Sequence, residues 1–166
     1  GAGHDAELIG KMGEATAQWT RATGIGWVFA PTLAVAQNTR WGRSYESFSS
    51  DPVLVKEYAS AYVKGLQGDL RGDGTVVATA KHFIGDGATD QGKDQGNAIV
   101  DKATMVNVHG QGYYGALAAG VQTVMASYNS WDDVAAKVDY GKMHRARALL
   151  TEAPKHKMGF AGLGVS

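Results

Sequence analysis

The stretch Thr75-Val76-Val77-Ala78-Thr79-Ala80 is a short apolar run that ends in the charged pair Lys81-His82. The run is rich in β-branched residues and predicts a strand that is buried on both faces. The run Ile25–Ala30 has the same character and leads to the polar cluster Arg40–Glu46. Such strands are typical of parallel sheets covered by helices, where ligands bind beyond the carboxyl ends of the strands. We therefore predict an α/β fold in which both polar clusters face one crevice.

Helical patterns separate these predicted strands. Between residues 5 and 23, the apolar residues recur at helical spacing and form one stripe of an amphipathic helix: Leu8, Met12, Ala15 and Trp19. A second helix is expected to begin after Ser50-Asp51-Pro52, with Val55, Tyr58, Tyr62 and Leu66 turned inward, and to end near Gly68. We further expect helices over residues 101–119 and 142–153 and strands over residues 121–126 and 163–166. Pro154 is expected to end or kink the last helix.

The order is helix then strand, repeated four times. This order predicts a partial, half TIM-type (β/α) barrel with about four parallel strands, in a single domain over residues 1–166. A complete eightfold barrel needs a longer chain.

The composition excludes several classes of partner. The formal net charge is zero, which argues against nucleic acid and against electrostatic binding to a membrane surface. The chain has no cysteine, so we expect neither disulfides nor thiolate metal sites. No run reaches transmembrane length and the first residues lack the features of a signal peptide, so the localisation stays unknown.

The polar clusters offer the chemistry of a sugar site. Arg43, Lys81 and His82 are hydrogen-bond donors and Glu46 is an acceptor, a mixture that suits a ligand with many hydroxyls. Flat aromatic faces that stack on a sugar or line a pocket are available at Trp41, Tyr128 and Trp131. The alternative is that Arg43 and Glu46 form an ion pair that only fixes a loop, and that the aromatic rings belong to the core.

Other polar groups give weaker signals. The acidic loop from Asp86 to Gly92 lacks the spacing of an EF-hand, so we interpret it as a solvated turn rather than a calcium site. The histidines His109, His144 and His156 form no zinc-binding pair on one helical face and are interpreted as ordinary surface or helix residues. We expect no metal and no cofactor.

Four ordered motifs resemble glycoside hydrolase family 3, the β-glucosidases and exo-β-glucanases. They are Phe29-Ala30-Pro31-Thr32-Leu33, then Arg40-Trp41-Gly42-Arg43-Ser44-Tyr45-Glu46-Ser47-Phe48-Ser49 with Asp51-Pro52, then Ala80-Lys81-His82-Phe83-Ile84-Gly85-Asp86-Gly87, and last Met125-Ala126-Ser127-Tyr128-Asn129-Ser130-Trp131. The resemblance covers nearly the whole chain.

The resemblance implies a (β/α)₈ catalytic domain, or a close variant, that retains anomeric configuration through a covalent intermediate. It implies that Arg43, Lys81 and His82 hold sugar hydroxyls, that Tyr128 lies beside the nucleophile, and that Glu46 orients the basic residues. In the family the nucleophilic aspartate follows a Val-Ser pair, and this chain stops at Ser166. The acid/base residue is expected from a later domain. A subgroup with a His-Asp pair in the loop after Lys-His is not expected, because that loop reads Gly85-Asp86-Gly87.

We therefore expect a barrel fragment that binds a β-glucoside or an oligosaccharide but does not turn it over alone. The alternative is a half-barrel scaffold that self-associates, as a homodimer or with a complementing barrel half, without catalysis. A third interpretation is a compact hydrolase that uses Asp86, Asp90 or Asp94 as its carboxylates.

Overall fold

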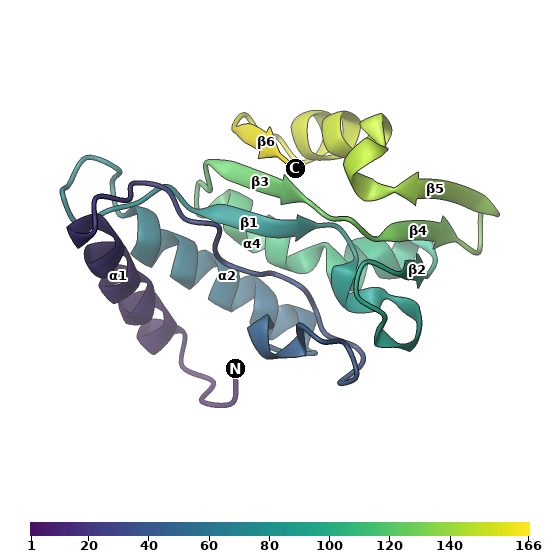
Figure 1. Ribbon diagram of the computed structural model, residues 1–166, viewed down its shortest axis with the longest axis horizontal. Coiled ribbons are helices and arrows are strands. Elements are labelled where there is room, and N and C mark those ends of the chain that lie inside the picture. Colours follow the sequence, from purple (N-terminus) through teal and green to yellow (C-terminus); the bar gives the residue numbers. More distant parts are fainter.

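A parallel sheet runs through the middle of the molecule (Figure 1). The computed structural model describes residues 1–166. Its main sheet has the order β1-β3-β6, with β1 at Thr79–Phe83, β3 at Thr123–Ala126 and β6 at Leu163–Val165, all parallel. The segment 26–32 lies along the other side of β1 through parallel bridges from Trp27 to Val77 and from Thr32 to Lys81. The predicted α/β fold with about four parallel strands, in the manner of a half barrel, is confirmed.

The segment at the edge of this sheet is not buried on both faces, as the sequence predicted. Ile25, Trp27 and Phe29 are 51%, 39% and 54% exposed, while the residues between them are half-buried. Because alternate side chains of an extended segment point to opposite faces, one face is uncovered. The apolar pattern identified the strand, but it could not show that no element within residues 1–166 packs on this face.

The second predicted strand begins later than its apolar run. Backbone pairing places β1 at Thr79–Phe83 rather than at residues 75–80. Lys81 donates its N–H to the carbonyl of Pro31 at 3.1 Å and accepts from the N–H of Leu33 at 2.6 Å. Lys81 and His82 therefore belong to the strand itself instead of following it.

Two helices begin and end close to their predicted positions. The first, α1, spans Ala6–Ala22, and Asp5 caps it by accepting from the N–H of Leu8 at 2.9 Å. The second, α2, spans Pro52–Gln67 after the cap Asp51 and ends at Gly68. Three of the four predicted inward residues of α2, namely Val55, Tyr58 and Leu66, are buried, and Tyr62 is half-buried.

The helix α1 packs through a different face from the predicted one. Its buried residues are Ile9, Gly13 and Ala17, whereas the predicted stripe is exposed, with Leu8 and Met12 at 51% and Trp19 at 80%. A Cβ on Gly13 would lie 2.8 Å from the carbonyl oxygen of Tyr62. The close contact with α2 therefore uses small residues, and the large apolar residues face outward.

The predicted helix over residues 101–119 is one helical run with a wide turn inside it. It consists of α3 at Lys102–Thr104, a π-helical turn at Met105–His109 and α4 at Gln111–Ala118. Figure 1 shows α1, α2 and α4 side by side, and α2 packs against both of the others. A Cβ on Gly115 would collide with the carbonyl oxygen of Lys56, so glycine allows α4 to approach α2 closely.

The second sheet and the helical region near the end of the chain differ most from the prediction. A second sheet, in the order β2-β4-β5, consists of Asn97–Ile99, Ser130–Asp133 and Val138–Lys142. The helix predicted over residues 142–153 is instead a 3₁₀ turn at Met143–Arg145 and a π-helix at Ala148–Lys157. Pro154 lies inside this helix and does not end it. The π winding bonds residues five apart, as in the 2.9 Å bond from Met158 N to Ala153 O, and relieves the crowding that proline causes in an α-helix.

Membrane-spanning geometry is absent from the helices, since none combines the length and the apolar character that a bilayer crossing requires.

The contact at Gly115 gives a test of the helix packing. We expect Gly115→Ala to lower the free energy of unfolding by up to about 2 kcal/mol, because overpacking costs about 1–3 kcal/mol and alanine regains about 1 kcal/mol of helix propensity. The measurement is urea denaturation. Gly164→Ala is the control, since a Cβ on Gly164 meets nothing within 4 Å. Equal stabilities of the two variants would contradict the packing role of Gly115.

Candidate functional site

Polar side chains gather at the carboxyl ends of the parallel strands. Lys81 and His82 lie in β1, and Tyr128 follows β3 by two residues. Lys81 pairs in register with Met125 of β3, and Phe83 pairs with Ala126, so these strand ends meet at one edge of the sheet. The peptide bonds Lys81–His82 and Phe83–Ile84 are cis. Arg43 precedes a 3₁₀ turn at Ser44–Glu46 that lies next to the same edge.

A cavity of about 160 Å³ opens at this edge. Three of the four predicted substrate-binding residues, Arg43, His82 and Tyr128, line it, together with Asp86, Asp94, Gln95, Met125, Ala126, Ser127 and Ser166. Lys81 does not line this cavity, but its charge acts on Arg43, Glu46 and Asp86. The fold therefore brings residues from three separate sequence motifs together around one cavity.

Arg43 and Glu46 form the ion pair that the sequence left as one alternative. Arg43 donates from Nε to Oε1 and from Nη2 to Oε2 of Glu46, both at 2.8 Å. The hydroxyl of Thr32 donates to the same Oε2 at 3.1 Å. The hydrogen bonds from Arg43 are the main cause that lowers the pKa of Glu46 to about 2. The same bonds are the main cause that raises the pKa of Arg43. Arg43 also lines the cavity, so the ion pair fixes the orientation of a guanidinium that faces the ligand space.

Lys81 has a different environment from Arg43. Its ammonium has no hydrogen-bond partner in the protein, although Lys81 is half-buried. Burial is the main cause that lowers its pKa, while the charges of Glu46 and Asp86 act in the opposite direction. An ammonium with unused donors and reduced hydration is suited to a hydroxyl or another polar group of a ligand.

Asp86 lines the cavity, although the sequence named it only as a carboxylate of the compact-hydrolase alternative. The acidic loop was interpreted as a solvated turn, but Asp86 is buried and its Oδ2 lies 3.0 Å from Nδ1 of His82. The 3₁₀ turn Asp86–Ala88 follows Gly85, whose φ of +95° favours glycine and turns the chain back toward β1. The available signal was the Gly85-Asp86-Gly87 turn directly after the Lys81-His82 strand.

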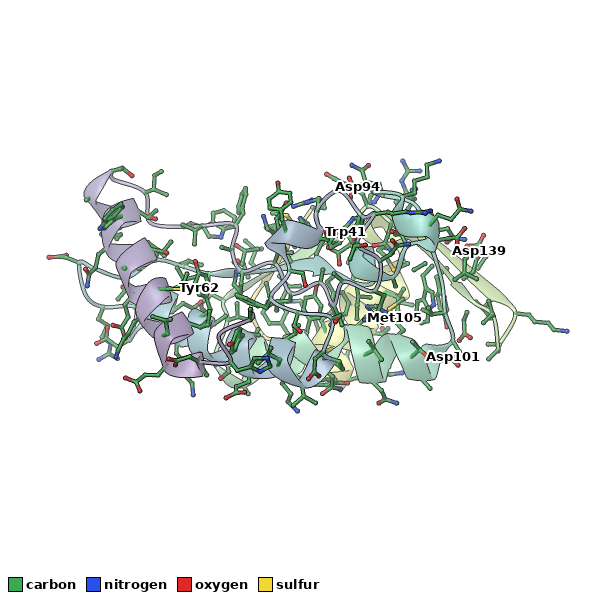
Figure 2. All side chains as sticks on the ribbon, turned by 90° about the horizontal axis from the view of Figure 1, so that it is seen from below. Trp41, Tyr62, Asp94, Asp101, Met105 and Asp139 are labelled. Atoms are coloured by element: carbon green, nitrogen blue, oxygen red, sulfur yellow. The ribbon has the colours of Figure 1, made fainter.

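The aromatic residues separate into two groups. Trp41 and Trp131 are both 2% exposed. Trp41 donates from its indole nitrogen to Oδ1 of Asp94 at 3.1 Å, and the two residues lie close together in Figure 2. Trp131 stacks on Tyr140 with ring centroids 4.3 Å apart, and it does not line the cavity. Tyr128 is 49% exposed and packs edge-on against His144. The ring faces of Trp41 and Trp131 thus lie in the protein interior, whereas that of Tyr128 is open.

The remaining polar groups do not form a second site. No cluster of three or more histidine, cysteine, aspartate or glutamate side chains is arranged to hold a metal ion. His109 was interpreted as an ordinary surface or helix residue; it lies in the π-helical turn but is buried, and burial lowers its pKa to about 4. His156 is exposed.

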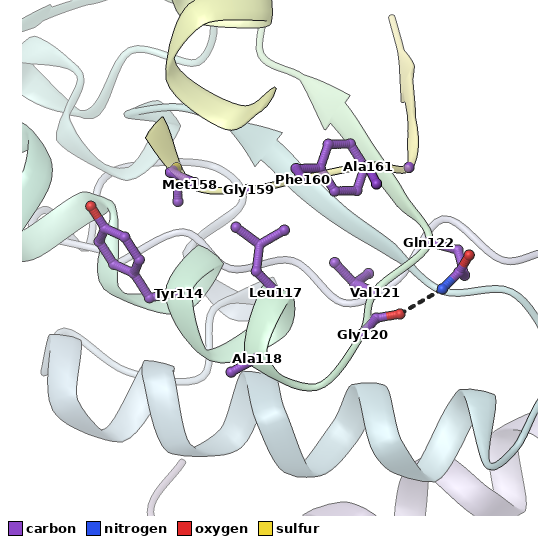
Figure 3. Close-up of a pocket in the computed structure, with 11 residues that line it drawn as sticks. Tyr114, Leu117, Ala118, Gly120, Val121, Gln122, Met158, Gly159, Phe160 and Ala161 are labelled. Atoms are coloured by element: carbon purple, nitrogen blue, oxygen red, sulfur yellow. Dashed lines mark hydrogen bonds between the residues drawn. The ribbon is translucent and has the colours of Figure 1, made fainter. Parts of the chain in front are cut away.

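A larger cavity of about 490 Å³ lies between α4 and residues 158–162 (Figure 3). Its lining is mostly apolar and contains no aspartate, glutamate, lysine, arginine or histidine. In Figure 3 the side chains of Tyr114, Leu117 and Phe160 border it. We therefore place the candidate site at the smaller polar cavity and not here.

The chain is similar to proteins that act on carbohydrates. Its residues 1–166 match the model of the glycosyl hydrolase family 3 N-terminal domain. A β-xylosidase of Formosa agariphila is 33% identical over 96% of this chain and 22% of its own length. A β-glucosidase of Rhizobium radiobacter is 30% identical over 100% of this chain and 19% of its own length.

Solved structures agree with these relatives. An exo-1,3/1,4-β-glucanase from a Pseudoalteromonas species superposes with a TM-score of 0.89 and 46% identity, over 97% of this chain and 20% of that one. A β-glucosidase from Listeria innocua in complex with glucose gives a TM-score of 0.90 with 28% identity, over 98% of this chain and 22% of that one.

The fold and these comparisons place the chain among the α/β barrel domains of glycoside hydrolases. The chain belongs to glycoside hydrolase family 3 and corresponds to the family's N-terminal domain. It spans about a fifth of the length of the relatives that it matches.

The Arg43–Glu46 pair makes stability depend on pH in acid. Because the pKa of Glu46 falls from its ordinary 4.5 to about 2 on folding, the unfolded chain takes up the proton first as the pH falls. The pair therefore stabilises the fold fully above about pH 4.5 and loses this contribution as the pH falls toward about 2. We expect the free energy of unfolding of the wild type to decrease more over this interval than that of Glu46→Gln, measured by urea denaturation.

The control for this comparison is Glu57→Gln, which removes an exposed carboxylate of α2. It should follow the wild-type pH dependence. Parallel curves for the wild type and Glu46→Gln would show that the pair does not contribute in this way.

Proposed function

We propose that residues 1–166 form the hydroxyl-binding part of the active site of a β-glucosidase-like hydrolase, with a β-glucoside or an oligosaccharide as its ligand. The observation that carries this proposal is the convergence of Arg43, His82 and Tyr128 on one cavity at the ends of parallel strands. The names of the relatives, β-glucosidase, β-xylosidase and exo-β-glucanase, support this class of ligand. The glucose bound to the Listeria innocua enzyme supports a neutral sugar.

The charges of the site suit a neutral ligand. Arg43 is compensated by Glu46 at 2.8 Å, and Asp86 is bonded to His82 at 3.0 Å. Such pairs hold the donors in fixed directions, and fixed donors lose less conformational entropy when a ligand binds. Tyr128 adds an open aromatic face that a sugar ring can contact.

The same pairs leave residues 1–166 poorly equipped for hydrolysis alone. Retaining hydrolysis uses two carboxyl groups about 5 Å apart, one as nucleophile and one as general acid. Glu46 accepts from Arg43 and Thr32, and with a pKa of about 2 it stays ionised at neutral pH and cannot protonate a leaving group. Asp86 is engaged by His82. We infer that hydrolysis needs carboxyl groups from outside residues 1–166, and that the predicted aspartate nucleophile is one of them.

Binding and hydrolysis by the 166-residue chain test this proposal together. We expect methyl β-glucoside to shift NMR signals of residues at the cavity, and Lys81→Ala to weaken binding by about 10- to 100-fold, as expected when a charged hydrogen bond is lost. Lys64→Ala, an exposed lysine of α2, is the control and should bind as the wild type does.

The same chain should not hydrolyse 4-nitrophenyl β-glucoside. Robust hydrolysis that Lys81→Ala abolishes would overturn the proposed division of roles. Single substitutions of Asp86, Asp90 and Asp94 would then identify the carboxylate responsible, as the interpretation of a compact hydrolase requires.

A second candidate function, self-association without catalysis, is favoured by the uncovered face of the edge segment. Ile25, Trp27 and Phe29 place three large apolar side chains along one face, each at least 39% exposed. An exposed apolar row beside an unpaired strand edge is a common site of association. A second copy of this chain offers the same row, so we propose that two copies meet through it.

Sedimentation velocity over a range of concentrations tests this second candidate. We expect the wild type to dimerise and Phe29→Ser to remain monomeric. Val53→Ser, which removes an apolar side chain that is 70% exposed on α2, is the matched control and should dimerise. A wild-type chain that stays monomeric at every concentration would contradict this proposal.

A further inference from the structure

His82 is held by Asp86 in one orientation. The distance from His82 Nδ1 to Asp86 Oδ2 is 3.0 Å, and the two side chains are only 13% and 10% exposed. The other carboxylate oxygen, Oδ1, accepts the N–H of Gly87 at 3.2 Å. Both oxygens of Asp86 are thus used, one by the imidazole and one by the backbone of its own turn.

This contact determines which ring nitrogen of His82 carries the proton. An ionised carboxylate is only an acceptor, so Nδ1 must donate to it. In the neutral imidazole, Nε2 is then an acceptor. Nε2 has no hydrogen-bond partner in the protein and is not among the buried unpaired atoms, and His82 lines the cavity.

The acceptor at Nε2 contrasts with the basic groups around it. Arg43 and Lys81 can only donate hydrogen bonds. A ligand group that contacts either cation needs only a lone pair, whereas a group that contacts Nε2 must supply a hydrogen. A sugar hydroxyl can do both, because it has one hydrogen and two lone pairs.

We propose that Asp86 is a positioning residue that fixes His82 in the Nδ1–H tautomer, so that Nε2 accepts the hydrogen of one ligand hydroxyl. The site then selects a sugar that bears a hydroxyl, as an O–H donor, at the position of the sugar ring that faces Nε2. This inference deepens the proposed function and rests on it for the identity of the ligand, while the tautomer itself can be measured without a ligand.

Other side chains of the cavity can also accept a hydrogen, among them Gln95 and Tyr128, and Asp94 is the carboxylate with a free oxygen. Asp94 is exposed and lines the same cavity, and only its Oδ1 is bonded, to Trp41 at 3.1 Å. A preference for a hydroxyl hydrogen can therefore arise at Asp94 instead of His82. The experiment must separate these two acceptors.

The first measurement is the tautomer of His82, from the nitrogen shifts and couplings of its ring in ¹⁵N-labelled chain at about pH 8, above the range in which an unperturbed histidine titrates. We expect the proton on Nδ1 in the wild type. Asp86→Asn should move it to Nε2, as the same substitution beside the histidine of serine proteases yields the wrong tautomer. Asp90→Asn, the same change at an exposed position of the same loop, should leave it on Nδ1.

Two results of this measurement would overturn the role of Asp86. One is a proton on Nε2 of the wild type, alone or together with one on Nδ1. The other is a folded Asp86→Asn variant in which the tautomer is unchanged. The wild-type spectrum decides the first point even if Asp86→Asn does not fold.

The second measurement is the affinity for methyl β-glucosides in which each hydroxyl is replaced in turn by fluorine, which cannot donate a hydrogen bond. When fluorine replaces the hydroxyl that faces Nε2 of His82, we expect the affinity of the wild type to fall about tenfold, because one hydrogen bond is lost. Asp86→Asn should bind the unmodified glucoside more weakly and show little further loss at that position. Asp94→Asn should keep the wild-type difference.

The outcomes distinguish this inference from the proposed function. Equal tolerance of fluorine at all positions, or a preference lost in Asp94→Asn and kept in Asp86→Asn, would overturn the acceptor role of His82 in a chain that still binds glucosides. A wild-type chain that binds no glucoside would overturn the proposed function and the acceptor role with it, but a proton on Nδ1 would still confirm what Asp86 does to His82.

Discussion

The fold depends on the hydrogen bonds that β1 makes on both of its sides. Residues 77–81 pair with the segment 26–32 on one side, and Thr79–Phe83 pairs with β3 on the other. These partners come from far apart in the sequence, and backbone groups inside a sheet must be paired because an unpaired buried group is costly. The pairing fixes the register of the strands, and the register determines which side chains meet at the edge of the sheet.

The candidate site follows directly from this pairing. Lys81 and His82 are carried by β1 itself, and Thr32, from the adjoining segment, reaches Glu46 and so connects the sheet to the turn that presents Arg43. Asp86 arrives on the turn that follows β1. Each basic group of the candidate site thus takes its position from the central strand itself or from an element that is bonded to it.

Sequence patterns predicted the succession of parallel strands along the chain, and the convergence of the candidate site residues, better than they predicted which faces of the elements are buried. The apolar runs and the polar residues after them identified four parallel strands and brought Arg43, His82 and Tyr128 together, because strand ends in a parallel sheet share one edge. The face of α1 could not be predicted from apolar spacing, since Gly13 allows a closer contact with α2 than Leu8 or Trp19 would. The hairpin of β4 and β5 was missed because its strands are short and polar. Burial of Asp86 depends on the turn at Gly85, which composition alone interprets as solvated.

The pairing of charges at the site also affects how a ligand arrives. Arg43 and Lys81 are countered by Glu46 and Asp86, Asp94 adds one exposed carboxylate, and the chain as a whole has no net charge. A site with so little excess charge produces only a weak field beyond about 10 Å at ordinary ionic strength. Capture of a ligand is therefore not accelerated by electrostatic steering, and its rate is set by diffusion and by the fit of the ligand to the cavity. Added salt should leave that rate nearly unchanged, in contrast to sites that attract charged substrates from a distance.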